Sequence, residues 1–152
     1  MQAQTDRPWR AGPAQAMADC GGECRGGCGL GEFDASGGAA TGGDVAARLR
    51  SGTDQPVSML ARWIVDRQVV SFACRAGLML PAFQFDFDLC QVRNGVAAAA
   101  SELSAGLNDK DVALWFVQDN AWLRDATPAA VLLSDAASVV NAARADRFAR
   151  RG

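Results

Sequence analysis

Apolar positions recur at helical spacing in the C-terminal part of the chain. Between residues 96 and 105 an apolar side chain returns every three or four positions, which predicts an amphipathic helix. Asn108 or Asp109 is the expected N-cap of a second helix, which contains the uninterrupted apolar run 112–117. A helix without a polar side belongs in the centre of a fold, so we expect Trp115 to be buried.

A polar connector, residues 118–126, follows this apolar run. Trp122 and Leu123 are the large apolar side chains within it, so they are expected to fold back onto the domain or to face a partner. A short helix of residues 128–133 comes next, with proline at its first position and Thr127 as its N-cap.

The last helix, which Ser134 or Asp135 caps, carries two different faces. Its core stripe, at spacings of three and four, consists of Ala136, Val139, Val140 and Ala143. A neighbouring face at helical spacing consists of Asn141, Arg144, Phe148 and Arg151. An aromatic side chain flanked by arginines is typical of a partner-binding surface. A frayed chain end whose phenylalanine packs against the domain would give the same pattern.

Residues 44–68 predict two short helices joined by a polar turn. The first covers residues 45–50, and the second runs from Met59 to about Gln68. Two such helices followed by a hairpin are the outline of a winged helix–turn–helix, in which the second helix enters a DNA groove. Arg62 and Arg67 would then contact DNA, but the second helix is mostly apolar, so the sequence favours a packed core helix.

Two strands are predicted after these helices, the first over residues 69–75 and the second from Leu78, with a tight turn at Ala76-Gly77. The second strand alternates in its later half. One face carries Phe83, Phe85, Phe87 and Leu89, and the opposite face carries Gln84, Asp86 and Asp88. The paired carboxylates suit catalysis or a hard metal ion. Solvated carboxylates on an exposed strand face explain them without a site, and this interpretation is favoured.

The first 43 residues differ in composition from the rest of the chain. They hold eleven of the sixteen glycines and few large apolar residues, so burial cannot offset their ordering entropy and we expect a disordered head. Cys20, Cys24 and Cys28 form a C-x3-C-x3-C pattern, to which Cys74 or Cys90 would add a fourth thiolate ligand. The spacings match neither zinc-ribbon nor ferredoxin patterns, so incidental thiols are favoured over a metal site.

Overall composition narrows the chemistry further. The 152 residues suffice for one domain, and the absence of histidine excludes Ser-His-Asp and Cys-His nucleophile systems. A net charge of −2 argues against a surface that binds nucleic acid as a whole. No segment has the length and apolarity of a membrane span, and the N-terminus lacks an export signal. We therefore expect a cytoplasmic protein with no membrane partner and, with five cysteines, no disulfide framework.

Together these patterns predict a mainly α fold of the α+β class, a helical bundle with a small antiparallel β-hairpin. The expected divisions are a disordered glycine-rich head over residues 1–43, a helix–turn–helix-like segment with the hairpin over 44–90, and a helical module over 91–152.

Three segments carry a family resemblance. They are LPAFQFD (residues 80–86), ALWFVQDNAWLRDATPAAVLL (113–133) and SVVNAARA (138–145). They resemble the toxin-binding region of Xre/MbcA/ParS-type antitoxins, in which a tryptophan-bearing apolar helix, a turn, an L-x-G element and a proline-led helix precede a V-x-x-A-A helix. MLARWIVDRQVVSF (59–72) with LPAFQFD is also similar to uncharacterised bacterial members of that group.

This chain departs from the family pattern in the connector. Its turn reads Asp119-Asn120 without the proline, and Arg124-Asp125 replaces the glycine after the leucine. The resemblance covers about residues 55–147 and leaves out the glycine-rich head.

The resemblance implies a small antitoxin without catalysis of its own, and we separately expect no bound metal or cofactor. Its expected partner is a cognate RES-type toxin, an enzyme that degrades NAD, and a homodimer and the protein's own operator DNA are further expected partners. The expected toxin-binding residues are Trp122, Leu123, Asn141, Arg144, Phe148 and Arg151. The alternative is a winged helix–turn–helix regulator without a toxin partner, which would use Arg62 and Arg67.

Overall fold

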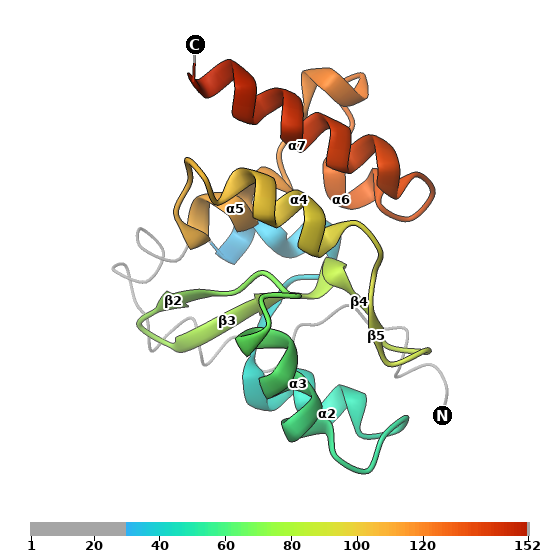
Figure 1. The fold of residues 1–152 in the computed structure, drawn as a ribbon. Coiled ribbons are helices and arrows are strands. Elements are labelled where there is room, and N and C mark those ends of the chain that lie inside the picture. The colour runs from blue at the N-terminus through green and yellow to red at the C-terminus, as the bar shows by residue number, and fades with distance from the viewer. Residues whose placement is uncertain (1–29, 152) are drawn as a thin grey trace.

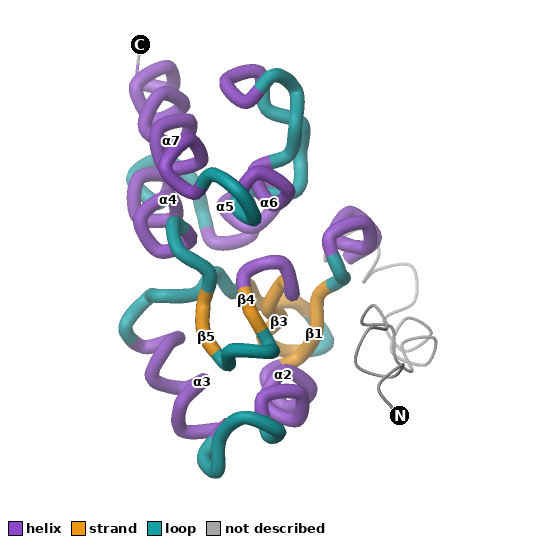
Figure 2. The backbone as a smooth tube through the Cα atoms, turned by 90° about the vertical axis from the view of Figure 1, so that its right-hand side faces the viewer, coloured by secondary structure: helices purple, strands orange, loops and turns teal. Residues whose placement is uncertain are grey.

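A three-stranded antiparallel sheet lies between two sets of helices in the computed structural model, which describes residues 30–151 (Figure 1). Strand β3 (Gly77–Pro81) is central, with β1 (Ala39–Thr41) on one side and β2 (Phe72–Cys74) on the other. Figure 2, turned by a quarter turn, shows the same order of layers, with α2 and α3 on one side of the sheet and α4 to α7 on the other. The predicted mainly helical α+β fold is confirmed, including the β2–β3 hairpin.

The sheet separates two apolar cores because successive side chains of a strand point to opposite faces. On β3, Met79 enters the main core and Leu80 enters the second core. The register places Phe72 opposite Met79 and Ala40 opposite Leu80, so residues bound for one core face each other across the ladder. The main core joins the hairpin to the C-terminal helices, and the second core joins the sheet to α2 and α3.

Helices α2 (Gly42–Leu49) and α3 (Pro56–Val65) are the two short helices that the sequence predicts, with shifted ends. Thr41 is the N-cap of α2, and its hydroxyl accepts a hydrogen bond from the Asp44 N–H. Helix α3 begins earlier than predicted because Pro56 suits the first helical turn.

Helix α3 ends earlier than predicted because the chain turns back at its C-terminus. The Arg67 N–H donates to the Ile64 carbonyl and the Gln68 N–H donates to the Trp63 carbonyl, the pairing of a Schellman motif. Arg67 adopts φ +57° there, a left-handed conformation that glycine normally supplies. The α3–β2 linker, residues 66–71, starts at this turn.

The C-terminal helices are α4 (Val96–Leu103), α5 (Asp109–Trp115), α6 (Pro128–Val131) and α7 (Ala136–Arg151), with the 3-10 turn η4 (Ala121–Leu123) between α5 and α6. Their predicted caps are confirmed. Asn108 accepts from the Asp111 N–H, Thr127 accepts from the Ala130 N–H, and Asp135 accepts from the Ser138 N–H. Trp115 is buried in the main core as predicted.

The alternating strand predicted for residues 83–89 is wrong. The chain instead forms the 3-10 turn η3 (Ala82–Gln84), the short strands β4 (Phe85–Asp86) and β5 (Gln91–Val92), and a tight turn between them. The four apolar residues do not share a face: Phe83 enters the main core, Phe85 enters the second core, and Leu89 is exposed. Asp86 accepts backbone hydrogen bonds from Asp88 and Leu89, a structural role within the turn.

Gln84, predicted on the solvated face, is fully buried. Its amide oxygen accepts from the Val70 N–H at 2.6 Å, and its amide nitrogen donates to the Val70 carbonyl at 2.9 Å and to the Pro81 carbonyl at 3.0 Å. Both polar atoms of the buried amide are therefore hydrogen-bonded. These bonds fix the α3–β2 linker to the end of β3.

Residues 30–43, assigned from sequence to the disordered head, are folded. They form the 3-10 helix η2 (Leu30–Ser36) and strand β1, and Phe33 is fully buried with its ring stacked on Phe72 at 5.5 Å between centroids. The burial of Phe33 in the main core and the pairing of β1 with β3 hold this glycine-rich segment.

Cys20, Cys24 and Cys28 lie outside the described residues. Within residues 30–151 no cluster of three or more histidine, cysteine, aspartate or glutamate side chains is arranged to hold a metal ion. Cys74 is disulfide-bonded, contrary to the expectation from sequence, and Cys90 is a free thiol.

No helix in the described part of the chain has the length and apolarity to cross a bilayer.

Candidate interaction surfaces

Asp146 on α7 holds two tryptophans from other elements. The indole N–H of Trp115 on α5 donates to one carboxylate oxygen at 2.5 Å, and the indole N–H of Trp122 on η4 donates to the other at 3.0 Å. Hydrogen bonds to an ionised group are stronger and more directional than neutral ones. One carboxylate thus fixes the rotation of α7 against both α5 and the connector.

Glu102 on α4 fixes α7 from a second side. Its carboxylate accepts from Arg144 Nε at 3.2 Å and from Arg147 Nη1 at 2.7 Å. These hydrogen bonds, that from Arg147 above that from Arg144, hold the pKa of the Glu102 carboxyl below its usual value. Asp135 at the start of α7 also has a lowered pKa, because the Ser138 hydroxyl and N–H donate to it.

The outer face of α7 consists of Asn141, Arg144, Phe148 and Arg151, and all four are exposed. Phe148 leaves 61 % of its surface open to solvent, so its ring does not pack against the domain. The sequence prediction of one exposed face is therefore confirmed for these four residues, although Arg144 also bonds to Glu102 and Asn141.

The two large apolar residues of the connector, Trp122 and Leu123, differ in exposure. Leu123 keeps only 9 % of its surface exposed and belongs to the main core, so it is not part of a partner-binding surface as the sequence suggested. Trp122 is 58 % exposed, but it lies beside Asp146. Asp146 and Phe148 are two residues apart, about 200° around a helix, so Trp122 and the outer face of α7 are on different sides.

The connector is held in a strained conformation. Asn120 is buried and its side-chain oxygen accepts from the Trp122 N–H, while Asn120 and Ala126 form an isolated bridge. Arg124 (φ +59°) and Asp125 (φ +66°) are both left-handed. They stand where the resembling family has glycine, so the departure in sequence falls on the two positions whose backbone favours glycine.

Helix α3 also presents an exposed face, which is largely apolar. Val57, Ala61 and Val65 follow one another at four-residue spacing along it, and all three are exposed. Arg62 is exposed beside this stripe.

Arg48 on the preceding helix lies over the Phe87 ring at 3.8 Å, and burial lowers the pKa of its guanidinium while Asp88 opposes that shift.

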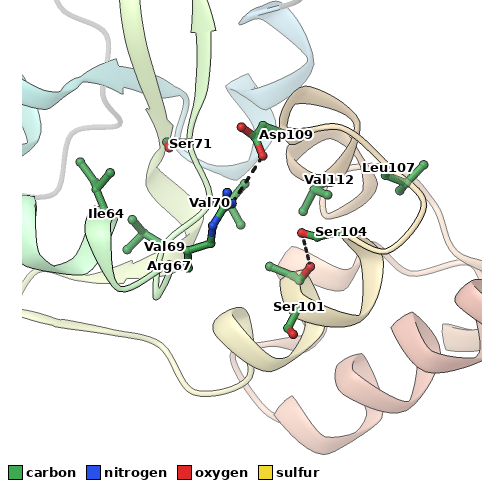
Figure 3. Close-up of a pocket in the computed structure, with 11 residues that line it drawn as sticks. Ile64, Arg67, Val69, Val70, Ser71, Ser101, Ser104, Leu107, Asp109 and Val112 are labelled. Carbon is green, nitrogen blue, oxygen red and sulfur yellow. Dashed lines mark hydrogen bonds and ion pairs between the residues drawn. The ribbon is translucent and has the colours of Figure 1, made fainter.

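Arg67 does not lie on α3 with Arg62, as the sequence prediction placed it. It follows the helix end and extends across a cleft to Asp109 at the start of α5, with 3.8 Å between Nη1 and Oδ1 (Figure 3). The cleft, of about 310 Å³, opens between the α3–β2 linker and helices α4 and α5.

Asp146 and Glu102, which position α7, are not among the residues that the sequence predicts to be functional. Asp146 continues the core stripe three residues after Ala143, and a carboxylate on a buried stripe indicates a nearby donor. In the structure the donors are the indole N–H groups of Trp115 and Trp122. Glu102 gives no comparable signal, because it is separated from Arg144 and Arg147 by more than forty residues.

No protein-family model, curated protein or solved structure matches this chain. Function is therefore inferred from the surfaces of residues 30–151 and from the sequence resemblance of residues 55–147.

Proposed function

We propose that this protein is an antitoxin-like interaction protein that binds and occludes a RES-type, NAD-degrading toxin through the outer face of α7. The observation that carries the proposal is the exposure of Phe148 on a helix whose rotation Asp146 and Glu102 fix. A large exposed aromatic next to arginines is the composition of binding hot spots. Burying a phenylalanine against a partner contributes roughly 1.5–3 kcal/mol.

Removing the end of α7 is a poor test, because Ala142 and Ala143 belong to the main core and Asp146 bonds to two tryptophans. Point substitutions on the exposed face avoid this. We expect Phe148→Ala to weaken binding to a RES-type toxin encoded beside this gene by about 10- to 100-fold. Binding is measured by calorimetry on co-expressed and separated proteins, and protection by recovery of cellular NAD.

Leu133→Ala supplies the matched control, because Leu133 is exposed to a similar extent in the loop before α7. Trp122→Ala reports on the other side of α7. A complex that survives Phe148→Ala and Phe148→Asp unchanged, or a gene neighbourhood without a RES-type toxin, would count against the proposal.

A winged helix–turn–helix regulator is the second candidate, favoured by the topology. The hairpin β2–β3 follows α3 directly and joins β1 in one sheet with the order β1-β3-β2. A homodimer would present two copies of α3 to operator DNA. We expect Arg62→Ala to weaken binding to the protein's own promoter and to reduce its salt dependence, with Arg150→Ala on α7 as the control. Equal affinity for promoter and random DNA would exclude this function.

A further inference from the structure

The cleft crossed by Arg67 and Asp109 has the features of a ligand site that the proposed function does not use. Its volume of about 310 Å³ is at the lower end of the range for small-molecule pockets, so it suits a small ligand. Ile64 and Val69 on the side of α3 and the linker, and Val112 of α5 on the opposite side, give the cleft an apolar lining. Ser101 of α4 and Ser104 at its C-cap give it hydroxyls (Figure 3). One wall is fixed, because Gln84 holds both backbone groups of Val70.

The ion pair between Arg67 and Asp109 at this cleft is weak. The side chains of Arg67 and Asp109 are 78 % and 65 % exposed, and 3.8 Å separates their nearest charged atoms. Exposed pairs of this length contribute little to stability, because water screens both charges. Both groups therefore keep hydrogen-bonding capacity for a ligand: the guanidinium has five N–H donors and the carboxylate has two acceptor oxygens.

Arg67 stands at a backbone position that favours glycine, which indicates a role for its side chain. It occupies the left-handed residue of the Schellman motif that ends α3, where glycine is preferred. An arginine there carries a backbone strain that the exposed ion pair does not by itself offset. The strained backbone directs the guanidinium across the cleft towards α5.

We propose that the cleft binds a free α-amino acid with a branched apolar side chain. Its carboxylate would pair with Arg67 and its ammonium with Asp109. Its side chain would contact the apolar lining that Ile64, Val69 and Val112 provide. The charge pattern selects this class. The Asp109 carboxylate repels a simple anion and the Arg67 guanidinium repels a simple cation. A zwitterion can pair favourably with both groups.

This site would have a structural consequence of its own. Arg67 follows α3 on one side of the sheet, and Asp109 begins α5 on the other, so a ligand that bonds to both ties the two sets of helices together. The site requires neither a toxin nor DNA, so it stands or falls independently of the function proposed above.

The test uses the full chain and titration calorimetry with L-leucine, L-isoleucine and L-valine as probes. Two analogues of leucine each remove one charge: 4-methylpentanoate lacks the ammonium and 3-methylbutylamine lacks the carboxylate. We expect one saturable site for at least one amino acid, and at least about tenfold weaker binding of either analogue. Failure of all three amino acids to saturate a site, or equal binding of the analogues, would overturn the proposal.

Two variants locate the site. Arg67→Gly keeps the preferred residue of the Schellman turn, so the fold is retained while the guanidinium is lost. Asp109→Asn removes the other charge with little change in shape. We expect each to weaken amino-acid binding by about tenfold or more, whereas Arg62→Ala and Asp111→Asn, at exposed residues of α3 and α5, leave it unchanged. Unchanged affinity in Arg67→Gly would place the ligand elsewhere and refute the assignment.

Discussion

Helices α3 and α7 carry the two proposed macromolecular binding faces, and they are held in different ways. Helix α3 packs on the second core through Leu60 and three partly buried neighbours, and its N-cap residue, Gln55, makes no side-chain cap hydrogen bond. Helix α7 packs on the main core and is also held by Asp135 at its start, by Asp146 to two tryptophans, and by Glu102 to two arginines.

The contrast between the contacts of α3 and those of α7 indicates which exposed side chains have a defined orientation. Apolar packing has no strong directional preference, so it fixes where a helix lies more firmly than how it is rotated. Hydrogen bonds to carboxylates are directional. Because α7 is held by them from two sides, the exposed ring of Phe148 is presented at a fixed orientation, which lowers the entropy that a partner must remove on binding.

The α3 side has its own polar contact, but it lies on the linker after the helix. Gln84→Leu would leave the N–H and carbonyl of Val70 buried without their partners. Each of these two unsatisfied buried groups costs about 1–3 kcal/mol, so we expect the free energy of unfolding to fall by roughly 2–6 kcal/mol. Urea denaturation followed by circular dichroism measures this change. Gln91→Leu, at an exposed glutamine in β5, is the control and is expected to change stability little. A loss below about 1 kcal/mol in Gln84→Leu would mean that water replaces the missing amide.

Asp146→Ala tests whether directional contacts hold α7. Both indole N–H groups lose their acceptor, but Trp122 remains half-exposed and can bond to water, so the expected loss is smaller, about 1–3 kcal/mol. Tryptophan fluorescence should shift to longer wavelength as Trp122 leaves α7. Asp119→Ala, an exposed carboxylate of the connector, is the control. If Asp146→Ala unfolds at the same urea concentration as the control, apolar packing alone holds the helix.

The parts of this fold that follow from local rules were predictable from the sequence. The sequence predicts Asn108 or Asp109, Thr127, and Ser134 or Asp135 as caps because each precedes an apolar helical pattern, and in the structure Asn108, Thr127 and Asp135 accept the cap hydrogen bonds. Helical spacing alone places Phe148 off the core stripe. These signals lie within a few residues of the feature that they specify, so no tertiary information was needed.

The parts that depend on distant partners were not predictable. Gln84 has the sequence context of a solvated strand residue, and only the approach of Val70, fourteen positions away, makes its burial favourable. Phe33 lies in a glycine-rich segment, and its burial depends on Phe72. The separation of Leu123 from Trp122 depends on Asp146, which holds one indole at the surface while its neighbour enters the core.

The connector that leads to α7 is expected to become more stable when its strain is removed. Arg124 and Asp125 adopt left-handed φ values without being glycine. Replacing a left-handed residue by glycine relieves about 1 kcal/mol of backbone strain, partly offset by the greater entropy of the unfolded chain. We therefore expect Arg124→Gly and Asp125→Gly each to raise the free energy of unfolding by roughly 0.5–1 kcal/mol, measured by denaturation. Ala121→Gly, at a residue with negative φ in η4, should instead lower it. Destabilisation by both connector substitutions would show that the arginine and aspartate side chains make contacts that outweigh the strain.

The smallest expected effect is the pH response of the contact between α4 and α7. The pKa of Glu102 is lowered in the folded protein by Arg147 and Arg144, so the ionised carboxylate binds more tightly to the fold than the protonated acid does. Its contribution to stability is present above the unfolded pKa of about 4.3 and is lost as the pH falls through the lower folded value. Glu102→Gln removes this titration but keeps a side chain of similar shape. The stability difference between wild type and Glu102→Gln should therefore be constant near neutral pH and should shrink as the solution is acidified below about pH 4. Asp135, whose pKa Ser138 lowers in the same direction, titrates in both proteins and cancels from the difference. A difference that stays constant down to full protonation would show that the two arginines do not depend on the charge of Glu102, and that α7 is held on this side by packing, as α3 is.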